Sequence, residues 1–320
     1  MSEFSSVAQQ VLILFVFVAV GFILGKTRVL SEGGAHGVTE IVLLVVTPCL
    51  IVTSFMRDIG SAMFVKLGLM ALAAAGSLGL NILAARLLLR DKDTARERVL
   101  RFGAVFSNCG FMALPLQQAL LGDDGVLLGA VFIVVFNLVQ WSYGVFEMTR
   151  DRRALSPKKI LFTPGLIGLV AGLAVFFLRV PLLHLAAQLP LLTWAAPVFT
   201  SPVRALAALN TPLAMTVVGY HLSTAPLRRV LTEKRAYAVA ALRLLALPLV
   251  SLGLLYLCGA RGLLLIACMI PVSAPCAAAT TMFAARYGQD AQLSVRLVSL
   301  TTLLSMVTMP CLVVLTKLIA

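Results

Sequence analysis

Residues 106–115 read FSNCGFMALP and lie inside an apolar segment, about 101–121, that is long enough to span a bilayer as one helix. Asn108, Gly110 and Pro115 nevertheless fall near the middle of this segment. Proline removes a backbone donor and glycine loosens a helix. Lipid offers no partner to freed backbone groups, which must be satisfied inside the protein or line a water-filled cavity. The stretch therefore predicts a broken membrane helix whose break faces protein.

The composition places the break in a polytopic membrane protein. The chain has 320 residues, of which 60% are hydrophobic and 12% charged, and this is too apolar for a soluble domain. The net charge of +13 could suggest nucleic acid, but the basic residues cluster in short loops between apolar runs. We therefore expect the lipid bilayer as a partner and no nucleic acid. None of the six cysteines forms a CxxC pair, so we expect no disulfide framework, no metal site and no cofactor.

The apolar runs predict an all-α fold of ten membrane helices. These spans are roughly 7–25, 38–56, 62–86, 101–121, 125–147, 162–179, 200–222, 236–258, 262–286 and 291–317. The region 180–200 is apolar but contains three prolines, and we interpret it as an extracytoplasmic linker along the membrane interface.

Lysine and arginine counts predict the orientation. Eighteen of them fall in the loops after the odd-numbered spans, and five lie on the opposite face. Because cytoplasmic loops carry the positive excess, the first set is expected in the cytoplasm. This predicts a multi-pass protein of the inner membrane with both termini outside the cytoplasm.

The two halves of the chain, 1–150 and 151–320, share features at matched positions. Thr47-Pro48 in the second span matches Thr211-Pro212 in the seventh, and Pro115 in the fourth matches Pro275 in the ninth; we expect a break at each. The offsets lie between 160 and 166 residues. Each half has five predicted spans, an odd number, so the second half is inserted upside down. Paired inverted repeats with broken helices indicate a transporter with a site near the midplane of the membrane.

The breaks in the fourth and ninth spans have a defined chemistry. If these helices cross near the bilayer centre, half-helices starting near Pro115 and Pro275 point their N-termini at the crossing. Helix N-termini carry partial positive charge and free N–H groups, and therefore attract anions. The preceding half-helices bring C-termini with partial negative charge, which a cation or a neutral donor such as Asn108 can satisfy.

An ordered set of short motifs resembles the auxin efflux carrier family, whose bacterial members are relatives of the plant PIN carriers. The motifs extend over essentially the whole chain. They are Asn108-x-Gly110 with Pro115, Asn137-x-x-x-Trp141-x-x-Gly144, Asn210-Thr211-Pro212-Leu213-Ala214-Met215 with Gly219, Arg243-Leu244-Leu245-x-x-Pro248, Pro275 with Thr280-Thr281, and Tyr287-Gly288-x-Asp290. Ala113 departs from the family, which often has a second glycine there.

The resemblance implies two inverted five-helix repeats with crossed broken helices 4 and 9, similar to bile-acid symporters and sodium–proton antiporters. It also implies a scaffold domain of spans 1, 2, 6 and 7 and a transport domain of spans 3–5 and 8–10 that moves in an elevator-like step. A homodimer through the scaffold helices is an expectation from the resemblance alone.

The candidate substrate-binding residues are polar groups at the predicted breaks. The Asn108 amide can donate to a carboxylate, or it can only cap the broken helix. Asn137 and Gln140 lie one turn apart and either face the same cavity or join helices. Arg243 lies about two turns inside the eighth span, where it either draws anions inward or snorkels to the surface. The full set is Asn108, Ser107, Gly110, Pro115, Asn137, Gln140, Asn210, Thr211, Ser273, Pro275 and Arg243.

The absence of acidic residues from the middle of every predicted span limits the mechanism. Antiporter relatives bind protons or sodium with buried carboxylates, and that chemistry has no carrier here. The sequence also lacks the HExxH and GxSxG motifs, so an enzyme is not expected. We expect a transporter of a small organic anion such as malonate, malate or an auxin-like carboxylate. The alternatives are a sodium-coupled symporter of the bile-acid type and a membrane sensor that binds without transport.

Overall fold

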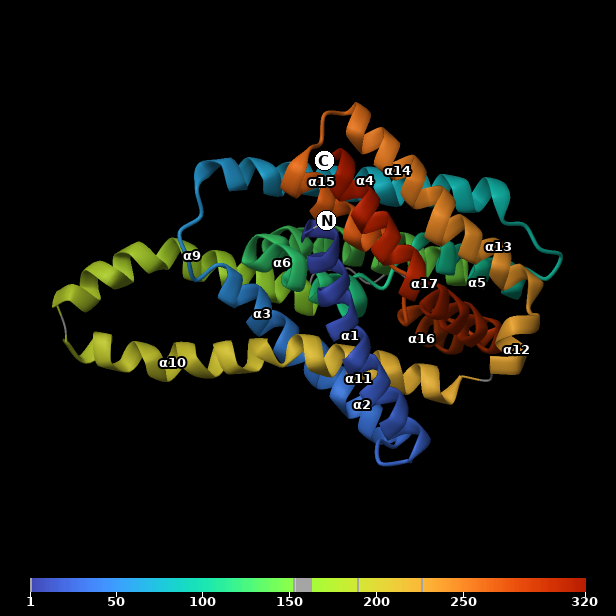
Figure 1. Ribbon diagram of the computed structural model, residues 1–320, viewed down its shortest axis with the longest axis horizontal. Helices are drawn as coiled ribbons and strands as arrows, with labels where there is room; N and C mark the ends of the chain where they lie inside the picture. Colours follow the sequence, from blue (N-terminus) through green and yellow to red (C-terminus); the bar gives the residue numbers. More distant parts are fainter. Residues whose placement is uncertain (1, 152, 154–162, 189, 226) are drawn as a thin grey trace.

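The computed structural model describes residues 2–151, 153, 163–188, 190–225 and 227–320 (Figure 1). Every regular element in this part of the chain is a helix, which confirms the predicted all-α membrane fold. The α-helices are α1 (Ser2–Lys26), α2 (Glu32–Ile41), α3 (Thr47–Ser54), α4 (Ser61–Leu88), α5 (Thr94–Val105), α6 (Leu114–Val139), α7 (Val145–Thr149), α9 (Pro164–Gln188), α10 (Pro190–Ala208), α11 (Asn210–Thr224), α12 (Leu227–Thr232), α13 (Lys234–Ala241), α14 (Leu247–Leu257), α15 (Gly262–Ser273), α16 (Ala279–Arg286) and α17 (Ala291–Ile319). The π-helical turns are η1 (Val42–Val46), η2 (Cys109–Ala113), η3 (Gln140–Gly144) and η5 (Leu242–Ala246).

Six helices in the described residues are long and apolar enough to cross a membrane, and two shorter apolar helices accompany them. One of the six, Cys109–Thr149, covers the end of the predicted fourth span and the whole of the fifth. Gly122, with φ of 59° and ψ of −146°, separates the two spans inside α6. Only glycine adopts this conformation without strain, so the chain can turn there.

Two of the predicted breaks are π-helical turns instead. Before Pro48 the helix widens at η1, and the Thr47 N–H reaches back to the Val42 carbonyl. Before Pro115 it widens at η2, and the Leu114 N–H reaches the Cys109 carbonyl. The expectation of breaks at Pro48 and Pro115 was therefore wrong, because a π-turn lets the helix continue past a residue that has no N–H. The fourth span does break, but upstream, at residues 106–108.

The other two predicted breaks are present. In the seventh span α10 ends at Ala208 and α11 begins at Asn210, with a turn at Leu209. In the ninth span α15 ends at Ser273 and α16 begins at Ala279. Proline accounts for the second of these, since the residue before Pro275 is held in extended conformation, with ψ of 152° at Ala274.

The region 180–200 is helical, so its assignment as a linker was wrong. Residues 180–188 continue α9 and residues 190–200 belong to α10, and these two helices extend furthest to the left in Figure 1. Pro190 opens α10, where the missing N–H costs no intrahelical bond. Pro197 lies inside the same helix, which is tolerated more readily in membrane helices than in soluble ones.

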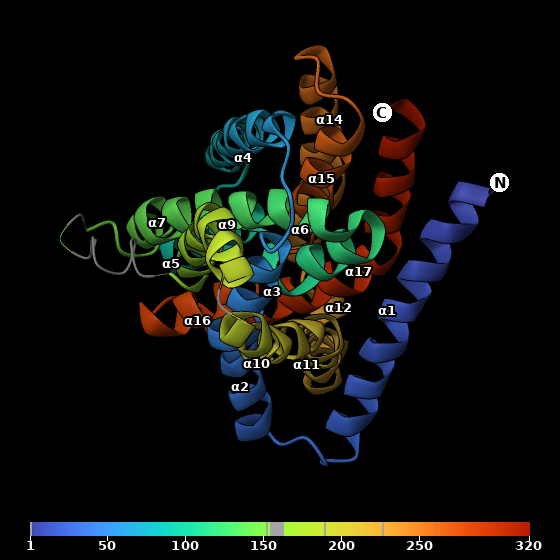
Figure 2. The same cartoon turned by 90° about the vertical axis from the view of Figure 1, so that its left-hand side faces the viewer.

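Two helix pairs pack at backbone distance through glycines. A Cβ added at Gly21 of α1 would lie 2.0 Å from the Thr216 carbonyl oxygen of α11, and one added at Gly219 would lie 2.0 Å from the Val18 carbonyl oxygen. A Cβ added at Gly168 of α9 would lie 3.0 Å from the Pro48 Cα of α3. Small residues allow membrane helices to approach this closely. The pairs α1–α11 and α3–α9 are thereby fixed, and Figure 2 shows α1 at one outer edge of the molecule.

The remaining helices form a second packed group, in which α15 lies against α6, α4 and α17. Ion pairs join the starts of three helices of this group. Glu233 contacts Arg96 at 3.0 Å and Arg296 at 3.1 Å, and Arg96 also contacts Asp290 at 3.3 Å. Burial opposes the charged form of Arg96, but the hydrogen bond to Glu233 and the nearby carboxylates outweigh it and raise the pKa of Arg96. This network connects the beginnings of α5, α13 and α17.

A second ionic cluster surrounds Glu147, whose side chain is fully buried. Its carboxylate lies 2.5 Å from Arg150, 3.6 Å from Arg101 and 3.8 Å from Arg86, and the Tyr143 hydroxyl donates to it at 3.1 Å. As expected for the acidic residues of the predicted spans, this carboxylate lies near a helix end.

Candidate functional site

The two helix breaks lie side by side and pair through their backbones. The Asn108 N–H donates to the Pro275 carbonyl at 2.7 Å, and the Ala277 N–H donates to the Phe106 carbonyl at 2.9 Å. Ser107 and Cys276 face each other in this antiparallel bridge. Both breaks are buried, so their backbone groups would otherwise lack partners. The pairing brings together two of the predicted site residues, Asn108 and Pro275, that are far apart in the sequence.

Asn108 lies directly before η2, and its carbonyl accepts the N–H groups of Met112 and Ala113 at 3.1 and 3.3 Å. Its side chain is 7% exposed and makes no hydrogen bond to any described residue. A Cβ added at the neighbouring Gly110 would meet nothing within 4 Å. The side of η2 that carries Gly110 therefore borders open space. Ser107 is almost fully buried beside it, and Pro115 lies in the first turn of α6.

Arg243 is 1% exposed and lies against the ends of both preceding half-helices. Its guanidinium donates to the Val272 carbonyl at 2.9 Å and the Ala274 carbonyl at 3.1 Å. It also reaches the Pro271 carbonyl at 3.4 Å and, at the end of α5, the Ala104 carbonyl at 3.5 Å. Arg243 therefore does not snorkel to the membrane surface. It satisfies carbonyl groups that the breaks leave without helical partners.

Asn81 has the matching place in the first half and is not among the residues predicted from the sequence. This residue of α4 is 3% exposed, and its Nδ2 donates to the Val105 carbonyl at the end of α5 at 3.3 Å. Arg243 follows Asn81 by 162 residues, within the range of the repeat offsets. A single asparagine in the apolar run 62–86 at that offset was the signal that could have identified it.

Three further residues make contacts within or between helices. Ser273 is fully buried and donates to the Ile270 carbonyl of its own helix at 3.0 Å. Gln117 of α6 donates to the Ala267 carbonyl of α15 at 2.8 Å and so joins the two broken spans. Trp141 packs on the Phe283 ring with a centroid distance of 5.1 Å.

The second and seventh spans also meet at their matched features. The Thr47 hydroxyl donates to the Asn210 Oδ1 at 3.2 Å, while the buried Asn210 Nδ2 has no partner among the described residues. The Thr211 hydroxyl lies 3.2 Å from Gln118 Oε1 of α6. Asn210 and Thr211 therefore lie where α11 contacts η1 and α6, and Asn210 keeps an unused donor.

Asn137 and Gln140 lie further along, at the end of α6 and the start of η3. The Gln140 Nε2 is buried and has no hydrogen-bond partner among the described residues. A Cβ added at Gly165 of α9 would lie 3.3 Å from the Asn137 Nδ2. No hydrogen bond in the described part of the chain joins either residue to the Asn108 break.

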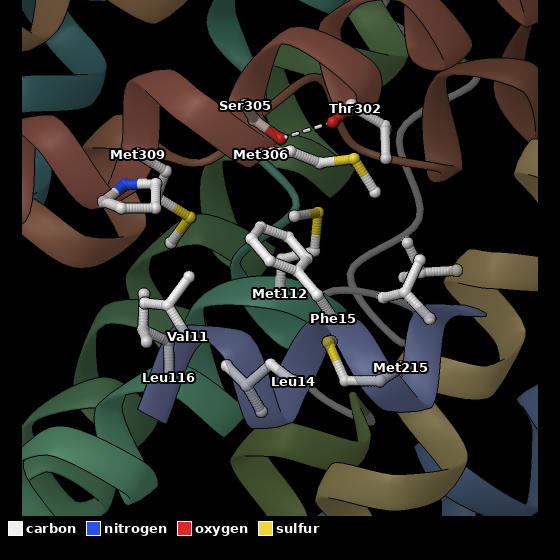
Figure 3. Close-up of a pocket in the computed structure, with 13 residues that line it drawn as sticks. Val11, Leu14, Phe15, Met112, Leu116, Met215, Thr302, Ser305, Met306 and Met309 are labelled. Carbon is white, nitrogen blue, oxygen red and sulfur yellow. Dashed lines mark hydrogen bonds between the residues drawn. The ribbon is translucent and has the colours of Figure 1, made fainter. Parts of the chain in front are cut away.

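A small apolar cavity lies beside η2, between α1 and α11 on one side and α6 and α17 on the other (Figure 3). Phe15, Met112, Met215 and Met306 point into it from four different elements. Its volume is about 30 Å³, enough for one water molecule. A second apolar cleft of about 280 Å³ shares Phe15 and Met306 with it. The cavity beside η2 is thus small and lined mostly by apolar side chains in this conformation.

Comparison with known proteins gives two matches. A family model described as "Membrane transport protein" matches residues 6–159 and 153–313. An uncharacterized transporter of Methanothermobacter thermautotrophicus is 26% identical over 310 residues, which cover 96% of this chain and 97% of that protein. Both similarities extend along nearly the whole chain and include both helix breaks.

Proposed function

Because the chain belongs to the membrane transport protein family, we propose that it is a secondary transporter of a small organic anion in the inner membrane. Carboxylates such as malonate, malate or an auxin-like acid are the substrate class that fits the site. The basic loops would face the cytoplasm and both termini the opposite side.

The observation that carries this proposal is the pairing of the two breaks beside the unpartnered Asn108 amide. The half-helix that begins at Cys109 starts at this point, and its N-terminus favours negative charge. The Asn108 amide offers two donors to a carboxylate. Asn210 holds another buried donor without a partner, on the α11 side. A substrate that supplies acceptors would pair with such donors.

The apolar cavity next to this break suggests where the body of the substrate lies. It is lined from α1 and α11 on one side and from η2, α6 and α17 on the other. Methionine side chains such as Met112 and Met215 adapt to different shapes at low cost. Since the cavity holds only about 30 Å³, the two sides must separate to admit a substrate. This requirement supports an elevator-type movement of one helix group against the other.

In that mechanism the scaffold contains α1, α2–α3, α9 and α10–α11, which include the pairs packed through glycines. The transport body contains α4 to α7 and α12 to α17, joined by the ion pairs of Glu233 and Glu147. The paired breaks would move with the transport body, and the residues around Asn210 would stay with the scaffold.

Flux into proteoliposomes tests the function. We expect the purified protein to move at least one of malonate, malate and indole-3-acetate, and Asn108→Ala to abolish this flux while the protein keeps its melting temperature. Thr27→Ala is the control, because its exposed hydroxyl bonds only within its own helical turn, to the Ile23 and Leu24 carbonyls. The proposal is wrong if no carboxylate moves or binds while an inorganic cation does. Full activity of Asn108→Ala would remove this residue from the site.

A further inference from the structure

The carbonyl-bearing ends of two half-helices meet at one side chain. α5 ends at Val105 and α15 ends at Ser273, and both ends are buried. The last carbonyls of a helix carry partial negative charge, and two such ends side by side repel one another unless a positive group lies between them. Arg243 is that group, since it binds carbonyls of both ends.

The charge of Arg243 has no carboxylate partner. Its hydrogen bonds within the described chain go only to backbone carbonyls, at Ala104, Pro271, Val272 and Ala274. Burying a cation at membrane depth is costly. At the matched position of the first half, the neutral Asn81 satisfies a helix-end carbonyl without any charge. Hydrogen bonding alone therefore does not require an arginine at this place.

The charge lies close to the anion-binding break. Arg243 binds the carbonyl of Ala274, and the next carbonyl along the chain, that of Pro275, accepts the N–H of Asn108. Asn108 is thus connected to the guanidinium through adjacent peptide groups. In a buried setting, a charge this close to Asn108 acts strongly on an anion bound beside that residue, because little water screens the charge.

We propose that Arg243 is a tethered cation that takes the place of a co-transported cation at the crossing of the two helix ends. Clustered carbonyl oxygens of this kind are ligands for hard metal cations. Here the guanidinium already occupies them, so the site carries its positive charge permanently and holds an anion without sodium. The inference rests on the proposed function for its consequence in transport, but the binding of a cation among these carbonyls can be measured separately.

The first experiment measures thermal unfolding of purified variants with guanidinium ion as the probe. We expect Arg243→Ala to melt at a lower temperature than wild type, and millimolar guanidinium chloride, far below denaturing concentrations, to restore most of the loss. Wild type and the control Arg261→Ala should not respond, because Arg261 is an exposed residue whose guanidinium contacts only the neighbouring Ala260 carbonyl and the Tyr256 carbonyl and ring at the end of α14. Absence of rescue in a folded Arg243→Ala protein would overturn the proposal.

A matched pair of variants separates charge from hydrogen bonding. Arg243→Lys keeps the charge and Arg243→Gln keeps donors without charge. We expect the lysine variant to retain most of the stability and flux, and the glutamine variant to lose both. Equal behaviour of the two variants contradicts the proposal, whether both are retained or both are lost.

The second experiment measures carboxylate flux by wild-type protein with sodium replaced by potassium or choline. We expect the rate to be unchanged, and a flux that stops without sodium would overturn the tethered-cation proposal. If wild type moves none of the carboxylates in any of these salts, the proposed function fails. The guanidinium rescue of Arg243→Ala would then still decide whether the carbonyls form a cation site.

Discussion

At the scale of single residues, buried polar groups divide into those that the fold has satisfied and those that it has left free. Arg243 and the Asn81 Nδ2 donate to carbonyls at the broken ends, and Gln117 donates to the Ala267 carbonyl inside α15. Asn210 and Gln140 keep buried amide N–H groups without a partner among the described residues, and the Asn108 side chain makes no cap hydrogen bond. Groups of the first kind hold the breaks in place, whereas unpaired buried donors are costly and usually have a functional explanation.

Glu147 is a buried polar group that the fold has satisfied, and its contribution to stability can be tested directly. Replacing it with glutamine leaves Arg86, Arg101 and Arg150 around a neutral amide. We expect Glu147→Gln to lower the stability by about 3 kcal/mol, the low end for breaking a buried ion pair, because two of the arginines are partly exposed. Thermal unfolding in detergent measures the change.

The exposed carboxylate Glu40 provides the control, since its pairing with His36 lies at the surface. Glu40→Gln should leave the melting temperature unchanged. A Glu147→Gln protein as stable as wild type would show that the three arginines do not depend on this charge.

At the scale of elements, helix continuity depends on how each proline is accommodated. A π-turn precedes Pro48, Pro115 and Pro248 and lets the helix continue. Pro275 instead lies in extended backbone, where its carbonyl pairs with the other broken span. The same residue type therefore marks a wide turn in three helices and a true break in one.

A second prediction concerns the close approach of α1 and α11. In Gly219→Ala, the new methyl group meets the Val18 carbonyl oxygen and forces the helices apart. We expect a loss of about 1–3 kcal/mol, as for other overpacked interfaces. The matched control is Gly76→Ala in α4, where an added Cβ meets nothing within 4 Å.

Gly76→Ala should be neutral or stabilising by up to about 1 kcal/mol, because alanine is the better helix former. Melting temperatures of the two variants, measured in the same detergent, give the comparison. Similar behaviour of both would mean that the α1–α11 contact is loose.

At the scale of the whole molecule, the helices fall into two groups that meet around the apolar cavity. Arg57, just after α3, forms an ion pair with Asp124 of α6, and this pair connects the proposed scaffold to the proposed transport body. By contrast, the ion pair between Arg235 and Asp91, at 3.4 Å, lies within the transport body. These two surface pairs allow the relative movement to be tested.

If the bodies slide past one another, a link between Arg57→Cys and Asp124→Cys should arrest carboxylate flux, and reduction should restore it. A link between Asp91→Cys and Arg235→Cys should leave flux intact. The variants require a background without the six native cysteines, all of which are free thiols. A short thiol cross-linker and a proteoliposome assay suffice, and unchanged flux in the linked Arg57–Asp124 pair would argue against an elevator movement.

Much of the fold could be predicted because its determinants are local. Hydropathy along the chain identified the all-α membrane class, since a bilayer demands long apolar helices. The polar and proline-containing stretches at 106–115 and 271–275 identified the fourth and ninth spans as broken, and Thr211-Pro212 did the same for the seventh. The prolines at 180–200 led to the wrong prediction of a linker. Their local effect is the same in a loop, at the start of a helix and in a tolerated kink.

By itself the sequence determined that this protein is a helical membrane protein with broken spans, the fourth and the ninth among them, and an arginine in an apolar segment. Only the tertiary structure decided that the breaks pair with each other and that the arginine lies on the carbonyls of both. Arg243 and the Ala104 carbonyl are 139 residues apart. Composition and periodicity act over a few turns of helix, whereas contacts at that separation depend on the path of the whole chain.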